Sequence, residues 1–115
     1  MKTIILELST IPVTFYVGRS QQENHAVIDL GGPDDIWCHL EGISSCHVVA
    51  VTPPNADRRL RSIIKRHAAI LCKQNTAKAA SQRNVPVTCA FLKHIQKDAQ
   101  IAGTVRVHES TTIIV

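Results

Sequence analysis

The sequence predicts an α+β fold, in which a mostly antiparallel sheet carries one short and one long helix packed on it. Short stretches rich in Val, Ile and Thr lie between Gly, Pro and Asn residues, which is typical of strands separated by turns. Two further segments combine capping residues with helical spacing of apolar side chains. A chain of 115 residues has the length of one domain, so we expect residues 1–115 to form a single domain.

Seven segments have the composition and length of strands. The first two flank Pro12, and the two around the turn at 41–45 predict a hairpin. Pro86 must lie at the start of its strand or on a sheet edge, because proline cannot donate a ladder hydrogen bond. The last two segments follow Gly103 and are expected to pair as a closing hairpin. The predicted strands are Ile4–Leu8, Val13–Val17, Ile36–Leu40, Cys46–Val51, Val85–Phe91, Thr104–Val107 and Thr111–Val115.

The short helix is expected to begin after Ser20, whose hydroxyl can cap it, with Glu23 at the position that completes a capping box. Gly31-Gly32-Pro33 should end this helix directly after Leu30. Its inward-facing residues are expected to be Ala26, Val27 and Leu30.

The long helix follows Pro53-Pro54, with Asn55 or Asp57 as its cap, and is expected to fray between residues 75 and 80. Apolar spacing typical of an amphipathic helix marks one side: Leu60, Ile63, Ile64, His67, Ala68 and Leu71. The opposite side is basic and consists of Arg58, Lys65, Arg66 and Lys73, flanked by Arg59 and Arg61. One side therefore packs on the sheet, and the other presents positive charge to solvent.

The distribution of charge is more informative than the net charge of +4. Ten Lys and Arg residues lie between Arg58 and Lys97 with no Asp or Glu among them, whereas the rest of the chain carries a net −6. A solvated helix face would explain part of this, but such faces usually interleave acids. Uncompensated positive charge is better tolerated against a polyanion, so we expect an anionic partner, with nucleic acid favoured over membrane.

Other classes of protein fit the composition poorly. Apolar stretches such as Val48–Val51 are far shorter than the ~20 residues that span a bilayer. The N-terminus reaches Glu7 after three apolar residues, too few for a signal peptide. We therefore expect a cytoplasmic protein without a membrane partner, whose four cysteines (Cys38, Cys46, Cys72 and Cys89) are reduced and buried.

Several strings, taken in order, resemble the RNA-binding C-terminal domain, NFACT-R, of the NFACT family of ribosome-associated quality-control proteins. They extend over nearly the whole chain from about Thr14: Tyr16-Val17-Gly18-Arg19, Gln22-Glu23-Asn24, Pro33-Asp34-Asp35-Ile36-Trp37-Cys38-His39, Ser45-Cys46-His47-Val48, Asn84-Val85-Pro86-Val87, Leu92-Lys93-His94-Ile95-Gln96-Lys97, Gly103-Thr104-Val105 and Thr112-Ile113-Ile114-Val115. The resemblance implies an α/β module that binds RNA. Proteins of this family bind the large ribosomal subunit with tRNA and promote untemplated tailing of stalled chains. This chain resembles only their terminal module, so we expect RNA binding from a stand-alone module and not tail elongation.

Two residues depart from the pattern of that family. Cys38 stands where the resemblance implies Phe, and Cys46 stands where it implies a small Gly or Ala. Aromatic residues make up only 3% of the chain, so the stacking platforms of other RNA-binding folds are nearly absent. Trp37 is expected in the core more than on an RNA-binding surface.

The pairs Cys38-His39 and Cys46-His47 raise the question of a metal site. Neighbours on a strand face opposite ways, so each pair can supply one ligand where a closed zinc site needs four. We therefore expect no metal and no other cofactor. The same alternation can place His39 and His47 on one face, where they could contact RNA or instead be satisfied by Asp34 or Asp35.

These observations lead to one preferred function and two alternatives. The preferred function is a non-catalytic RNA-binding module for tRNA or ribosomal RNA, with the ribosome as a further partner. A protein–protein adaptor for an acidic partner is the second hypothesis, and a small enzyme using Cys46 or a metal is the third. The residues expected to contact RNA are Arg19, His39, Ser45, His47, Arg58, Arg59, Arg61, Lys65, Arg66, Lys73 and Lys93.

Overall fold

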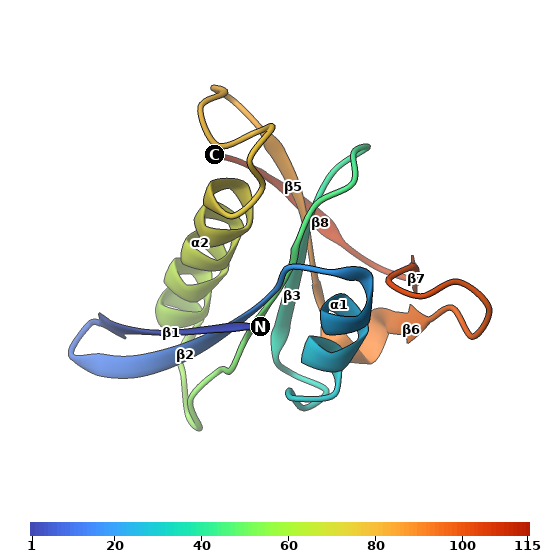
Figure 1. Cartoon of the computed structure of the whole chain (residues 1–115). Coiled ribbons are helices and arrows are strands. Elements are labelled where there is room, and N and C mark those ends of the chain that lie inside the picture. Colours follow the sequence, from blue (N-terminus) through green and yellow to red (C-terminus); the bar gives the residue numbers. More distant parts are fainter.

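The computed structural model describes residues 1–115 and contains one six-stranded sheet, one two-stranded sheet and two α-helices (Figure 1). The large sheet has the order β1-β2-β4-β3-β5-β8, and every neighbouring pair is antiparallel. The predicted α+β class with a mostly antiparallel sheet is therefore confirmed. The elements are β1 (Lys2–Leu8), β2 (Ile11–Gly18), α1 (Gln21–Ile28), β3 (Ile36–Leu40), β4 (His47–Ala50), α2 (Arg58–Gln74), β5 (Pro86–Phe91), the 3₁₀ turn Leu92–His94, β6 (Ile95–Lys97), β7 (Val105–Val107) and β8 (Thr111–Ile114).

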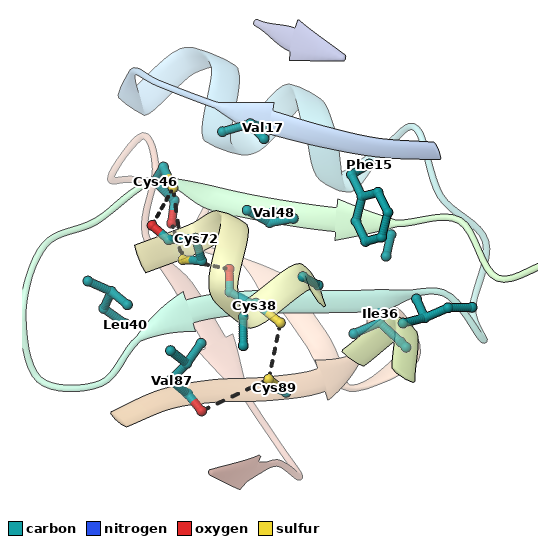
Figure 2. Packing of buried hydrophobic residues seen from close by; sticks show 14 of the residues in the cluster. Phe15, Val17, Ile36, Cys38, Leu40, Cys46, Val48, Cys72, Val87 and Cys89 are labelled. Carbon is teal, nitrogen blue, oxygen red and sulfur yellow. Dashed lines mark hydrogen bonds between the residues drawn. The ribbon is translucent and has the colours of Figure 1, made fainter. Parts of the chain in front are cut away.

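Helix α2 covers one face of the large sheet and forms the main core there (Figures 1 and 2). Ile64 and Ala68 of α2 are fully buried against side chains of the central strands, among them Phe15, Leu40 and Val48. Removing a large apolar side chain of this kind from water contributes about 1.5–3 kcal/mol. This core holds the long helix on the sheet and leaves its other side free.

The opposite face of the sheet is covered as well. Helix α1 and the small sheet β6–β7 lie on this side (Figure 1), and Val27 packs with Trp37, Val49, Ala90 and Leu92. Trp37 is only 2% exposed, which agrees with its expected place in the core. Because both faces are covered, β4 is buried at all four positions and β3 at four of its five.

Both helices begin at predicted caps. The Ser20 hydroxyl accepts a hydrogen bond from the backbone N–H of Glu23 at 3.1 Å. The Glu23 carboxylate reaches back one residue further than a capping box requires and accepts from the backbone N–H of Arg19 at 3.0 Å. Of the two candidates for α2, Asp57 is the cap and accepts from the backbone N–H of Leu60 at 2.8 Å. Asn55 instead adopts a left-handed φ of 63° in the preceding turn.

The inward faces of the helices differ in part from those predicted. Helix α1 ends at Ile28, so of the three residues expected inside only Val27 is buried, while Ala26 and Leu30 are exposed. The buried side of α2 also differs from the predicted stripe, since Ile63, His67 and Leu71 are only partly buried while Ala69 and Cys72 are buried. Its buried residues are Leu60, Ile64, Ala68, Ala69 and Cys72.

The predicted closing hairpin is wrong. Strand β7 pairs with β6, with Gln96 opposite Arg106, and β8 instead joins the edge of the large sheet beside β5, with Val87 opposite Ile113. The two strands follow each other along the chain, which favoured pairing between them. The sequence does not show that residues 108–110 carry the chain from the small sheet to the large sheet. Pro86 occupies the first position of β5, as expected. Neither helix has the length and apolar character required to cross a membrane.

Replacing Asp57 by Ala is expected to lower the free energy of unfolding by about 1 kcal/mol, because the N–H of Leu60 loses its partner at the start of α2. Urea denaturation measures the change. Asp57→Asn is the matched control, since it removes the charge and keeps the capping oxygen. Equal stability of the Ala and Asn variants would contradict a capping role.

Candidate nucleic-acid interface

A groove of about 480 Å³ lies between the first half of α2 and the strands β5 and β8. We call it the basic groove. Its cationic residues come from two elements that are far apart in the sequence: Arg58, Arg61 and Lys65 from α2, and Lys93 from the 3₁₀ turn. Phe91 lies at its floor and is 38% exposed. The fold thus joins four of the predicted RNA-binding cations on one concave surface.

The charge of the basic groove is almost uncompensated. None of its three α2 cations takes part in an ion pair, and Lys65 only donates a hydrogen bond to the Thr111 hydroxyl at 3.3 Å. The one acid that lines the groove is Glu109, whose carboxylate lies 3.3 Å from the His94 ring nitrogen. The residues that line the groove therefore carry a net positive charge.

Lys93 is held between two partners. Its ammonium lies 3.3 Å from the Asp34 carboxylate, an exposed pair, and 5.2 Å from the centre of the Phe91 ring. An exposed ion pair of this kind contributes little, typically below about 1 kcal/mol. Lys93 can therefore exchange Asp34 for a phosphate at small cost, and its ammonium lies beside a partly exposed aromatic ring on which a base or sugar could pack.

A second cavity, of about 490 Å³, lies on the α1 side of the large sheet. We call it the histidine pocket. His39 of β3 and His47 of β4 line it together with Ser45 and Asn24, and residues 102–105 form the opposing wall. His39 points away from α2 because its neighbour Cys38 points toward it, as the alternation of a strand requires. The expectation that the two histidines share a face is confirmed.

Three rings pack together at the base of the histidine pocket. The His39 ring lies parallel to Trp37 with centres 5.8 Å apart, and the His47 ring stands edge-on to both. The Trp37 indole N–H donates to Nδ1 of His47 at 3.2 Å, and Oδ1 of Asn24 accepts from the His47 backbone N–H at 3.0 Å. The expected carboxylate partners are wrong, because Asp35 instead accepts from the backbone N–H groups of Gly32 and Thr52, each at 2.7 Å.

Both histidines are electrically neutral at physiological pH. Burial, reinforced by the neighbouring His39, lowers the pKa of His47 to about 3. Burial also lowers the pKa of His39. No Lys or Arg lines this pocket, and its only carboxylate is Glu41. The histidine pocket is therefore a polar site without positive charge, unlike the basic groove.

Ser45 also lines the histidine pocket, but its hydroxyl is already engaged in the turn before β4. It accepts from the backbone N–H of Leu40 at 3.0 Å and donates to the carbonyl of Cys46 at 2.9 Å. Ser45 therefore holds the β3–β4 connection in shape, and contact with a ligand through its hydroxyl would require one of these bonds to be shared.

The remaining predicted residues lie in neither cavity. Arg59 and Arg66 are exposed on α2, and Lys73 donates to the Val115 carbonyl at 3.3 Å near the end of that helix. Arg19 lies between β2 and α1, 3.9 Å from the Glu23 carboxylate. Of the patch expected from Arg19, Lys93, Ser45 and the two histidines, His39, Ser45 and His47 meet in the histidine pocket, whereas Lys93 lines the basic groove and Arg19 lines neither cavity.

Sequence reasoning missed two residues of these sites. Phe91 was assigned only to a strand, although an aromatic residue beside Leu92-Lys93 in a basic segment is a possible stacking position. Asn24 was not singled out, although asparagine inside a short helix is unfavourable and indicates a specific role. Gly18 supports that role, since a Cβ there would lie 2.6 Å from Oδ1 of Asn24.

The cysteines lie on the other side of the sheet from His39. Cys46 packs against Cys72 with sulfurs 3.9 Å apart, and Cys38 faces Cys89 with sulfurs 3.1 Å apart (Figure 2). Burial raises the pKa of Cys38, which favours the unreactive thiol. Hydrogen bonding to Cys72 and Thr76 lowers the pKa of Cys46, but its thiol packs in the core under α2 while His39 lies on the opposite face of the sheet, so the two cannot form a Cys–His pair. No group of three or more His, Cys, Asp and Glu side chains is arranged to hold a metal ion.

The stability of the protein should fall below pH 6.5, because His47 must stay neutral when folded and takes up a proton when unfolded. The pKa of the folded state is lowered to about 3, so stability present at pH 7 is lost progressively toward acid. The loss attributable to His47 is about 2 kcal/mol between pH 7 and 5. His47→Asn keeps an acceptor for the Trp37 N–H without the titration. Denaturation at both pH values should show a weaker pH dependence in this variant, and an identical dependence would contradict the assignment.

Comparison with known proteins gives a consistent result. A family model described as NFACT protein RNA binding domain matches residues 4–109. Coiled-coil domain-containing protein 25 of Danio rerio is 28% identical over 94 residues, which cover 78% of this chain and 44% of that protein. The protein of the same name from Bos taurus is 28% identical over 104 residues, covering 87% of this chain and 49% of that protein. The chain thus spans about half the length of these relatives.

One solved structure has the same fold. The C-terminal part of the fibronectin/fibrinogen-binding protein from Streptococcus suis superimposes with a TM-score of 0.78 at 20% sequence identity, over 96% of this chain and 43% of that chain. At this identity the likeness concerns the fold alone. The family match covers nearly the whole sheet together with both helices, including every residue that lines the two cavities except those beyond residue 109. This chain therefore belongs to the NFACT protein RNA binding domain family.

Proposed function

We propose that this domain is a non-catalytic RNA-binding module of the cytoplasm whose basic groove and α2 surface hold structured RNA. The candidate ligands are tRNA and ribosomal RNA, in a translation or ribosome quality-control context. Membership of an RNA-binding domain family supports RNA as the ligand. The observation that carries the choice of surface is that three α2 cations without ion-pair partners, Arg58, Arg61 and Lys65, meet Lys93 in the basic groove.

The spacing of these cations suits a phosphate backbone. Arg58, Arg61 and Lys65 follow one side of α2 over about 10 Å, at a rise of about 1.5 Å per residue. A nucleic acid strand carries a phosphate every few ångströms along its axis, so this row can contact more than one phosphate at once. Such contacts supply affinity and orientation but little choice of sequence. We therefore expect a preference for RNA shape over RNA sequence.

An acidic protein could in principle use the same cations. The Phe91 ring under Lys93 favours RNA, because an exposed aromatic surface between cations offers stacking to an unpaired base as well as charge. Exposed arginines outside the groove add long-range attraction. Docking on an acidic protein remains the alternative function, and ribonuclease treatment distinguishes it from RNA binding.

The triple variant Arg58→Ala/Arg61→Ala/Lys65→Ala should weaken tRNA binding and flatten its dependence on salt. For the unchanged protein, the logarithm of affinity should fall with the logarithm of salt concentration by about 0.7–0.9 per neutralised phosphate. The triple variant should reduce this slope by about 2–3 units. Fluorescence anisotropy with labelled tRNA measures both quantities.

The matched control is Arg59→Ala/Arg66→Ala/Lys78→Ala, which removes the same charge from exposed positions outside the basic groove. It should lower affinity less and leave most of the slope intact. Equal effects of the two triple variants would mean that net charge alone attracts RNA, and the basic groove would be abandoned as the contact surface.

Ribonuclease treatment should release the protein from large particles in a cell lysate. We expect the protein to sediment with ribosomal material before digestion and to move to the light fractions afterwards, because its partner is RNA. The groove variant should remain in the light fractions without digestion. Protein that stays in the heavy fractions after complete digestion would instead support the adaptor role.

A further inference from the structure

We propose that the histidine pocket binds a single unpaired nucleobase, on the face of the sheet opposite the basic groove. This inference rests on the proposed function, because it assigns a second and different contact to the same RNA ligand. The carrying observation is that His47 lines this pocket and that Nε2 of its ring makes no hydrogen bond within the protein.

The protonation of His47 is determined by its neighbour. The Trp37 indole nitrogen can only donate, so Nδ1 of His47, 3.2 Å away, must be the acceptor and carries no proton. In the neutral ring the proton then resides on Nε2. His47 is 2% exposed, and its ring makes no second hydrogen bond. The Nε2–H of His47 is therefore a donor of fixed direction in the cavity. A ligand that displaced water from it without accepting its hydrogen bond would lose about 1–3 kcal/mol.

The chemistry of the pocket selects against phosphate and in favour of a neutral, flat ligand. Its walls contain no Lys or Arg, and Glu41 would repel an anion. The donor on His47 calls for an acceptor, such as a carbonyl oxygen or ring nitrogen of a base. The hydroxyl of Thr88 lines the same space and makes no hydrogen bond in the protein, so it can serve a base edge or a ribose hydroxyl.

The size and shape of the pocket agree with this ligand. About 490 Å³ falls within the range of small-ligand sites. His39 is partly exposed, and its ring lies parallel to Trp37, so an aromatic ligand can pack beside an existing pair of rings. Gly103 keeps the far wall close to α1, because a Cβ there would lie 3.0 Å from Cα of Gln21, and its φ of +79° disfavours other residues.

The position of the pocket requires the base to be unpaired. Ile36 lines the basic groove and His39 lines the histidine pocket, about 10 Å apart along β3 and on opposite faces. One base-paired stem cannot fill both sites. A terminal or looped-out nucleotide, connected to a stem held by α2, could pass around the sheet and enter the pocket, since unstacked bases are what proteins usually read in RNA.

The protein contains a built-in reporter, because Trp37 is its only tryptophan and contacts both histidines. Titration with adenosine, guanosine, cytidine and uridine should give a saturable change in tryptophan emission with at least one of them. The affinity should not depend on salt, since nucleosides are uncharged. Ribose alone and inorganic phosphate should give no change. Ring-proton NMR shifts of His39 and His47 provide a second readout that does not rely on emission.

The variants separate this proposal from the basic groove. His47→Asn keeps the bond to Trp37 and removes the Nε2 donor, so nucleoside affinity should fall by roughly 10-fold or more. Thr88→Val should weaken binding less, and Arg58→Ala/Arg61→Ala/Lys65→Ala should leave nucleoside affinity unchanged. Near-ultraviolet circular dichroism and cooperative unfolding show that each variant is folded.

These experiments distinguish failure of the pocket proposal from failure of the proposed function. If no nucleoside changes the emission or the histidine shifts while tRNA still binds through α2, the pocket proposal is wrong and the proposed function stands. If nucleosides bind but the groove variant retains full tRNA affinity and salt dependence, the pocket is supported and the basic groove is not the RNA surface. Nucleoside affinity that is the same for the unchanged protein and His47→Asn would also overturn the role of His47.

Discussion

The burial of both faces of β3 and β4 is the constraint on which the rest of the structure depends. Successive side chains of a strand alternate between faces, and here one face meets α2 while the other meets α1 and the small sheet. Cys38 and His39 are therefore separated by the thickness of the sheet despite being neighbours. A histidine can remain at this depth because the Trp37 N–H donates to Nδ1 of His47 and the Asn24 side chain accepts from its backbone N–H, while Nε2 faces the histidine pocket.

The same constraint explains why two departures from the family pattern leave the histidine pocket intact. Cys38 and Cys46 both point toward α2 and join Cys72 and Cys89 in a sulfur-rich part of the core (Figure 2). Free cysteine behaves there as a small apolar residue. A change of volume at these positions is accommodated by packing against α2, while the rings of the pocket are positioned on the opposite face.

The two cavities divide recognition between charge and hydrogen bonding. The basic groove concentrates cations of which those on α2 have no carboxylate partner, and such a surface attracts a polyanion over a distance that salt shortens. The histidine pocket contains no Lys or Arg and presents the Nε2 donor of His47 in a fixed direction. A module with both surfaces can hold the backbone of an RNA without regard to sequence and still distinguish one unpaired nucleotide.

The sequence by itself determined the fold class, the cap at Ser20, a cap of α2 at either Asn55 or Asp57, the basic side of α2 and the shared face of the two histidines, because these follow from local periodicity and capping chemistry. Only the tertiary structure decided that Lys93 joins the α2 cations, that Phe91 is exposed between them, and that β8 leaves the expected hairpin to pair with β5. Such contacts join residues that are distant along the chain, and local sequence patterns do not predict which distant surfaces pack together. The histidine partners were missed for the same reason, since Trp37 and Asn24 reach His47 from two other elements.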